Sequence, residues 1–243
     1  MKTVLFVASA AAAVAASADA GFLGFVASAR NVGANTVIDI FAGVSNSSDK
    51  FLNVYNTVSN GTFVQKAGLA SKTWKPDVAG FTSTRNTSDD SFMTAGTFSG
   101  GSYGGEFYAS TNTNGDPNFT GTSWSATPAS PAATTIPNNA GWYTGDPTSV
   151  DNNAESLAGL VGRVNAGGTA SAANFGIWCA HLVVAGNNKV IGTDFTFGAF
   201  ASIKDGVNGS VSQAQSSFVV IPAPGAIALI GVAGLAAGRR RRA

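Results

Sequence analysis

Short runs of β-branched and aromatic residues, separated by clusters of Gly, Asn and Ser, constrain the fold of this chain more than any other feature. Runs of this length, bounded by turn signals, are typical of β-strands. About ten such strands in one body favour an all-β fold, a single antiparallel β-sandwich over 21–220 with a jelly-roll-like order as one form. We expect strands at 36–44, 51–58, 62–66, 90–98, 106–110, 174–186, 189–203 and 211–221.

Local signals add detail to this prediction. The dipeptide Asn60-Gly61 favours a tight hairpin turn between 51–58 and 62–66. Alternation in the first of these runs would place Leu52, Val54 and Val58 on one face.

Two other segments do not look like strands. The segment 153–164 has apolar residues at helical spacing after Asn153, so it is the one candidate for a short helix, although Gly159 and Gly162 weaken it. The stretch 111–153 is rich in Asn, Thr, Ser, Pro and Gly, and predicts a long loop.

The N-terminus resembles an export signal. Lys2 precedes the apolar run Val4–Ala16, and small residues then offer cleavage sites after Ala18 or Ala20. This order is typical of a secretory signal peptide over 1–20, which a signal peptidase removes. The alternative is an N-terminal helix of the folded body.

The C-terminus holds an uncharged apolar segment, 225–238, followed by four arginines, 239–242. Extended back to Phe218, the uncharged stretch is long enough to cross a bilayer as a helix. Arginines directly behind it would hold that end in the cytoplasm. The alternatives are a core helix with a solvated basic tail, or a basic patch for nucleic acid.

The same tail carries a resemblance to a known family. Pro222-Ala223-Pro224, the apolar segment and the Arg cluster (Arg239, Arg240, Arg241, Arg242) resemble in order the PEP-CTERM sorting signal of Gram-negative bacteria. The resemblance covers 221–243 only, and Ala223 stands where the family usually has Glu. It implies cleavage by an exosortase-type enzyme and delivery to the cell surface or the exopolysaccharide matrix. It implies no activity for the body.

Composition excludes several classes of function. A formal charge of +1 over 243 residues, with 11% charged residues, gives no electrostatic basis for binding nucleic acid. A single Cys excludes a disulfide framework within the chain, and a single His excludes a multi-histidine metal site.

Candidates for catalysis are few. In a strand, Cys179 and His181 would share a face, yet side chains two residues apart are about 6 to 7 Å apart, too far for a nucleophile–base pair. We therefore interpret them as a buried thiol and a hydrogen-bonded histidine. Glu106 and Glu155 are the only glutamates, and either would need a second carboxylate to cleave glycosides.

Two kinds of binding site remain as weaker hypotheses. Asp89, Asp90 and Asp205 lie in turn-like settings that could hold calcium, although the same residues commonly form Asx turns. The other hypothesis concerns aromatic residues in polar surroundings, which could stack on sugar rings or fold back onto the body. These are Trp74, Trp124, Trp142 and Tyr143.

The sequence thus predicts an exported surface or matrix protein without enzymatic activity or a required cofactor. Its role would be structural or adhesive, in association with exopolysaccharide. The alternatives are a carbohydrate-binding module that uses the aromatic residues, and an enzyme that acts on polysaccharides through Glu106.

Overall fold

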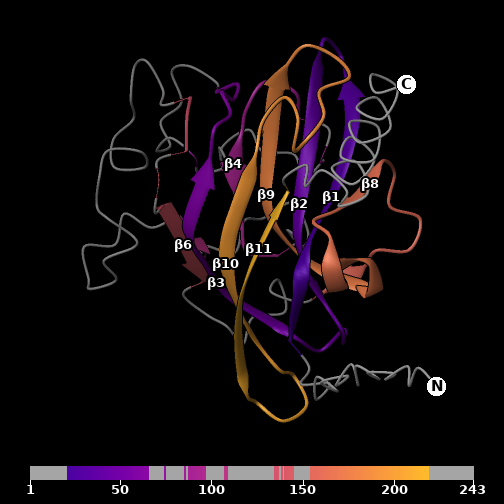
Figure 1. Ribbon diagram of the computed structural model, residues 1–243, viewed down its shortest axis with the longest axis vertical. Coiled ribbons are helices and arrows are strands. Elements are labelled where there is room, and N and C mark those ends of the chain that lie inside the picture. Colours follow the sequence, from indigo (N-terminus) through magenta and orange to yellow (C-terminus); the bar gives the residue numbers. More distant parts are fainter. Residues whose placement is uncertain are drawn as a thin grey trace, which may run out of the picture.

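The computed structural model consists of two antiparallel β-sheets (Figure 1). It describes residues 21–65, 74, 85, 87–96, 107–108, 134–136, 138, 140–144 and 154–218. The predicted all-β class is confirmed, since the only regular helix in these ranges is the short 3₁₀ helix η2 (Gly168–Ala172).

The first sheet, sheet A, has the strand order β4-β9-β2-β1-β8, with β7 also paired to β9. Its long strands β1, β2 and β9 lie side by side at its centre. The bounds are β1 Phe22–Val32, β2 Asn35–Val44, β4 Phe92–Met93, β7 Glu155–Ser156, β8 Arg163–Asn165 and β9 Phe175–Ala185.

The second sheet, sheet B, has the order β11-β10-β3-β6-β5. Its centre is formed by β10 and β3, and the short strands β6 and β5 lie at one side. The bounds are β3 Lys50–Ser59, β5 Phe107–Tyr108, β6 Ala140–Thr144, β10 Phe197–Lys204 and β11 Val211–Phe218.

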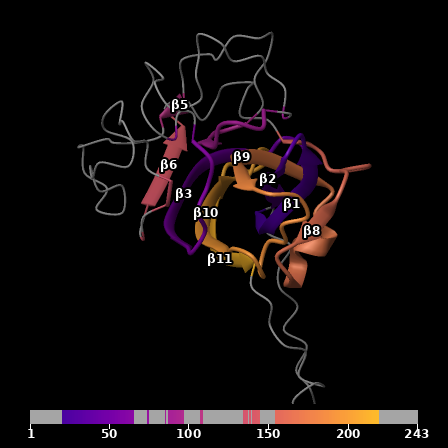
Figure 2. The ribbon, with the colours of Figure 1, turned by 90° about the horizontal axis from the view of Figure 1, so that it is seen from above.

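One apolar core lies between the sheets. It joins Ile38 and Leu182 of sheet A to Val54, Trp142 and Phe197 of sheet B in a single cluster of buried side chains. Figure 2 shows the strands of both sheets curving around the space that these side chains fill. Burial of this apolar area is the main term that stabilises the fold.

At one side the two sheets meet along β1 and β11. The main-chain N–H groups of Phe22 and Phe25 donate to the hydroxyls of Ser212 (3.1 Å) and Ser216 (3.2 Å). The Phe25 ring also stacks on Phe218, with 6.5 Å between ring centroids. Serine side chains therefore join β1 to β11 at this seam.

The strands expected at 36–44, 174–186 and 211–221 correspond to β2, β9 and β11. The run 90–98 forms a strand only at β4, and 189–203 only from Phe197 onward. The strand β1 had no counterpart among our expectations. It joins β2 through a two-residue turn in which Gly33 has a φ of 61°, a conformation that favours glycine.

The predicted hairpin at Asn60-Gly61 is wrong. β3 pairs with β10 and β6, and residues 60–65 leave sheet B, so that the Val64 N–H donates to the carbonyl of Val183 in β9. Phe63 is 1% exposed, and the free energy of burying its ring outweighs the preference of Asn60-Gly61 for a hairpin turn. The Asn60 side chain instead accepts hydrogen bonds from Thr196.

The predicted face of Leu52, Val54 and Val58 is also wrong. Two register shifts interrupt β3, so that Val54 points into the core while Leu52 is half-buried and Val58 is 55% exposed. β-bulges of this kind insert an extra residue and reverse the alternation beyond it.

The predicted helix over 153–164 does not form in the described residues 154–164. They contain β7, turns and the start of β8 instead. Gly159 and Gly162 have φ values of 73° and 59°, which an α-helix excludes. A Cβ built on Gly162 would lie 1.9 Å from the carbonyl oxygen of Ala29, so the chain approaches β1 closely at this point.

The predicted loop 111–153 is interrupted by β6, which pairs with β3 and β5. In the part of the chain that the structure describes, no helix is long and apolar enough to cross a membrane. The segments 1–20 and 221–243, where a signal peptide and a sorting tail are expected, lie outside the described residues.

Candidate functional site

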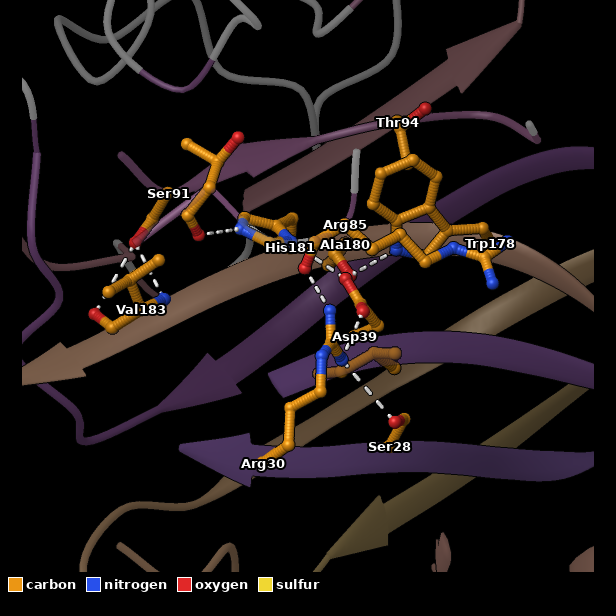
Figure 3. A network of polar contacts seen from close by, with 12 residues as sticks. Ser28, Arg30, Asp39, Arg85, Ser91, Thr94, Trp178, Ala180, His181 and Val183 are labelled. Atoms are coloured by element: carbon orange, nitrogen blue, oxygen red, sulfur yellow. Dashed lines mark hydrogen bonds and ion pairs between the residues drawn. The ribbon is translucent and has the colours of Figure 1, made fainter. Parts of the chain in front are cut away.

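A buried polar cluster on the face of sheet A that points away from the core is the candidate site (Figure 3). The register places Ser28 of β1, Asp39 of β2, His181 of β9 and Phe92 of β4 side by side across the sheet. Asp39 and His181 are both 0% exposed. One row of cross-strand neighbours therefore brings an acid and a histidine together.

Asp39 is the centre of this cluster. Its Oδ1 lies 2.7 Å from His181 Nδ1, and its Oδ2 lies 2.7 Å from the guanidinium of Arg30. Arg30 also donates to the hydroxyl of Ser28 and to the carbonyl of Arg85. A buried carboxylate is tolerated when both oxygens have such partners.

Both ring nitrogens of His181 face acceptors. The second one, Nε2, lies 2.9 Å from the carbonyl oxygen of Thr87, which can only accept a hydrogen bond. Because Asp39 is ion-paired to Arg30, its carboxylate also accepts at Nδ1. Both nitrogens are thus engaged within the fold.

Aromatic rings enclose the cluster. The His181 ring stacks on Phe92 at 4.7 Å and meets the edge of Trp178 at 6.0 Å. The guanidinium of Arg85 lies 5.0 Å from the ring centroids of both Trp178 and Phe41, and it forms an ion pair with Glu155 of β7. These contacts hold Arg85 over the rings of Phe41 and Trp178 and tie it to β7, a strand of the same sheet.

The geometry does not suit acid–base catalysis. A general base needs a free nitrogen lone pair within hydrogen-bond reach of its substrate. His181 is fully buried and its two nitrogens bind Asp39 and Thr87. The cluster instead holds β1, β2, β9 and the 85–92 segment together.

The expected common face of Cys179 and His181 is wrong. The register between β2 and β9 shifts at Cys179, because Ile40 pairs with Ala180 while Phe41 pairs with Trp178. Cys179 therefore points into the core and His181 away from it. The interpretation of a buried thiol and a hydrogen-bonded histidine is confirmed. Burial raises the pKa of the Cys179 thiol.

The calcium candidates lie on different sheets. Asp89 and Asp90 precede β4 of sheet A, whereas Asp205 follows β10 of sheet B. Asp205 Oδ1 accepts hydrogen bonds from the N–H groups of Val207 (2.6 Å) and Asn208 (3.1 Å), which is an Asx turn. Within the described ranges, no group of three acidic, His or Cys side chains could hold a metal ion.

A second buried carboxylate lies next to that turn. Asp49, 0% exposed, accepts hydrogen bonds from the N–H groups of Asn46 (3.1 Å) and Gly206 (3.2 Å). Burial, and to a smaller extent the nearby charge of Asp205, raise the pKa of Asp49, and the two hydrogen bonds oppose this shift. This pair joins the loop after β2 to the loop after β10.

The aromatic candidates in the described residues are Trp142 and Tyr143 of β6 in sheet B, and Trp74, which bridges to Phe92 of β4 in sheet A. Trp142 is 0% exposed in the core, so its ring cannot stack on a sugar, and Trp74 is buried as well. Tyr143, the next residue of β6, is half-buried and lies opposite Asn53 of β3. The sugar-binding hypothesis is therefore corrected for Trp142.

Other candidates lie outside the described residues. They include both processing signals, one aromatic candidate and one glutamate, namely Ala18, Ala20, Glu106, Trp124, Pro222, Ala223, Pro224, Arg239, Arg240, Arg241 and Arg242.

Sequence reasoning missed Asp39, although a signal for it was present. Asp39 interrupts the apolar run 37–44 of β2, between Ile38 and Ile40, just as His181 interrupts the apolar run of β9. An ionisable side chain that must be buried needs a partner. The single acid in one apolar run and the single histidine in another could therefore have been predicted to be partners.

Comparison of the chain with protein-family models, with curated proteins and with solved structures finds no match.

Proposed function

We propose that the protein is exported, sorted to the cell surface or extracellular matrix, and acts there as a structural or adhesive component beside exopolysaccharide. The observation that carries this proposal is the tail, in which a Pro-containing motif, an apolar segment and an Arg cluster follow one another at 222–242. Signal peptidase and an exosortase-type enzyme are the processing partners.

In this proposal the C-terminal segment forms a helix that holds the chain in the inner membrane until the tail is cut. The body between the signals needs no cofactor. A jelly-roll-like order of its strands also stays a prediction.

The polar cluster on sheet A supports a structural role for the body. Arg30, Asp39 and His181 are bound to each other or to main-chain carbonyls, and Arg85 is paired with Glu155. Such contacts hold strands together and leave these side chains engaged within the fold. The burial of Trp142 removes one support for the carbohydrate-binding alternative.

The sorting signal can be tested by deleting Arg239–Arg242 from the full chain in a host that has an exosortase. We expect the deletion variant to stay uncut and to be misplaced, because the positive charges that fix the topology are gone. Surface fractionation and the size of the recovered chain measure this.

A matched control replaces the four arginines by lysines, which keeps the charge. Normal delivery of the lysine variant would show that the loss of sorting in the deletion variant comes from the loss of positive charge. Normal cleavage and delivery of the deletion variant would refute the sorting proposal.

A further inference from the structure

The edges of the two sheets differ greatly in length. In the described residues, β4, β8 and β5 end their sheets with two, three and two residues, whereas β11 has eight. The pairing of β11 with β10 also runs over all eight residues without a register shift. Short or bulged edges prevent pairing with other strands, and β11 has neither protection.

The outer edge of β11 is open. Among the described residues its main-chain ladder runs to β10 alone, and β1 contacts it through side chains, namely the hydroxyls of Ser212 and Ser216 and the ring of Phe218. Gln213, Ala214 and Gln215 in the middle of the strand are exposed. Main-chain groups on the side away from β10 are therefore available to another strand.

The strand also lacks the residues that usually block an edge. Residues 211–218 include no charged residue and no proline. Lys at an edge repels a second copy, and Pro removes a donor. A neutral strand meets no electrostatic repulsion when it pairs with itself.

The sequence of β11 is self-complementary. Residues 212–216 read Ser-Gln-Ala-Gln-Ser, the same in both directions around Ala214. In an antiparallel pair related by a two-fold axis at Ala214, Gln213 faces Gln215 of the second copy and Ser212 faces Ser216. Each of these five side chains then meets one of its own kind.

A hollow borders the edge of β11 in the described residues. A cleft of about 300 Å³ lies between Ala214–Ser217, the start of β1 and the turn before η2. Nothing lies within 4 Å of a Cβ built on Gly167 or Gly168 at its far wall. On the face of β11 that points to this side, Ser212, Ala214 and Ser216 are small.

We propose that β11 is a self-association edge, where two copies of this chain pair antiparallel about Ala214 and join their B sheets into one. This inference rests on the edge of sheet B and is independent of the sorting proposal. It names a second copy of the chain as the partner.

Cysteine cross-linking of the full-length chain tests the pairing directly. Directly opposite residues of an antiparallel pair have Cα atoms about 4.5 to 5.5 Å apart, within the range of a disulfide. The only native cysteine, Cys179, is buried. Under mild oxidation, Ala214→Cys should form disulfide dimers on a non-reducing gel.

The matched control is Val207→Cys, at a turn residue that is 75% exposed and lies off the edge. We expect about tenfold more dimer from Ala214→Cys than from this control, because only position 214 meets its own copy. Equal dimer yields from the two variants would overturn the proposal.

A charge exchange tests the same edge without a cross-link. Gln213→Lys with Gln215→Lys places like charges opposite each other, and the corresponding double Glu variant does the same with opposite sign. Tagged full-length chains of either variant should not capture their own kind, while the Lys variant should capture the Glu variant. Both variants are on exposed positions and share the same tail, so association through the tail would be equal in every mixture.

Capture of each charged variant by itself at the wild-type level would overturn the proposal, as would failure of the wild-type chain to capture itself.

Discussion

Two aspartates with the same burial lie in opposite electrostatic environments. Asp39 and Asp49 are both 0% exposed. Asp39 contacts the guanidinium of Arg30 and the ring of His181, whereas Asp49 contacts two main-chain N–H groups and lies near the carboxylate of Asp205.

This comparison shows that burial alone does not determine what a carboxylate contributes to stability. Around Asp39, opposite charges offset the loss of hydration. Around Asp49, desolvation and a like charge outweigh the hydrogen bonds, and so the pKa is raised. We expect substitutions at the two positions to differ in size and in pH dependence.

The largest effect is expected for Asp39→Ala. This change leaves the guanidinium of Arg30 and the ring of His181 without their shared partner in a buried cluster. Loss of one member of such a network costs about 3 to 5 kcal/mol of the free energy of unfolding, measured by denaturant titration.

The control for Asp39→Ala is Asp194→Ala, which removes a surface ion pair to Lys189. We expect a much smaller change there, because water screens exposed charges. Similar losses of unfolding free energy at both positions would show that the cluster on sheet A stabilises the fold no more than a surface ion pair does.

A smaller effect is expected for Asp49→Ala. It removes the acceptor for the N–H groups of Asn46 and Gly206 without leaving a cation unpaired. Unpaired buried donors cost about 1 to 3 kcal/mol. Asp49→Asn, which keeps one acceptor, should lose less in the same denaturant titration, and a loss larger than that of Asp39→Ala would reverse the comparison.

The smallest effect is the pH dependence from Asp49. Because its pKa is raised in the folded state, its protonated form favours folding; this contribution is complete below the ordinary value of 3.8 and is lost as the pH rises through the folded-state pKa. The free energy of unfolding of the wild type, relative to Asp49→Asn, should therefore decline from acid to neutral pH. An increase in this free-energy difference from acid to neutral pH would contradict a raised pKa at Asp49.

The fold class and two of the three central strands of sheet A, β2 and β9, could be predicted from the sequence, whereas β1 was missed. Long apolar runs give β2 and β9 directly, because strands with both faces covered need apolar residues throughout. Local signals failed where tertiary contacts opposed them. Asn60-Gly61 favours a hairpin, but burial of Phe63 directs the chain to the other sheet.

The candidate site was predictable only in part. The buried, bonded state of His181 followed from its apolar neighbours, but its partner did not. The β-bulge at Cys179 turns His181 to the outer face, where it meets Asp39. Such an irregularity depends on how two distant strands match, and no local pattern encodes it.

The close approach of Gly162 to β1 limits which substitutions this position can accept during evolution. A side chain there would collide with the carbonyl of Ala29, and Gly206 has a similar conflict, 2.0 Å from the carbonyl of Ser48. Exposed Ser, Thr and Asn positions can be exchanged freely in comparison. We expect distant members of this lineage to share these two glycines when little else aligns.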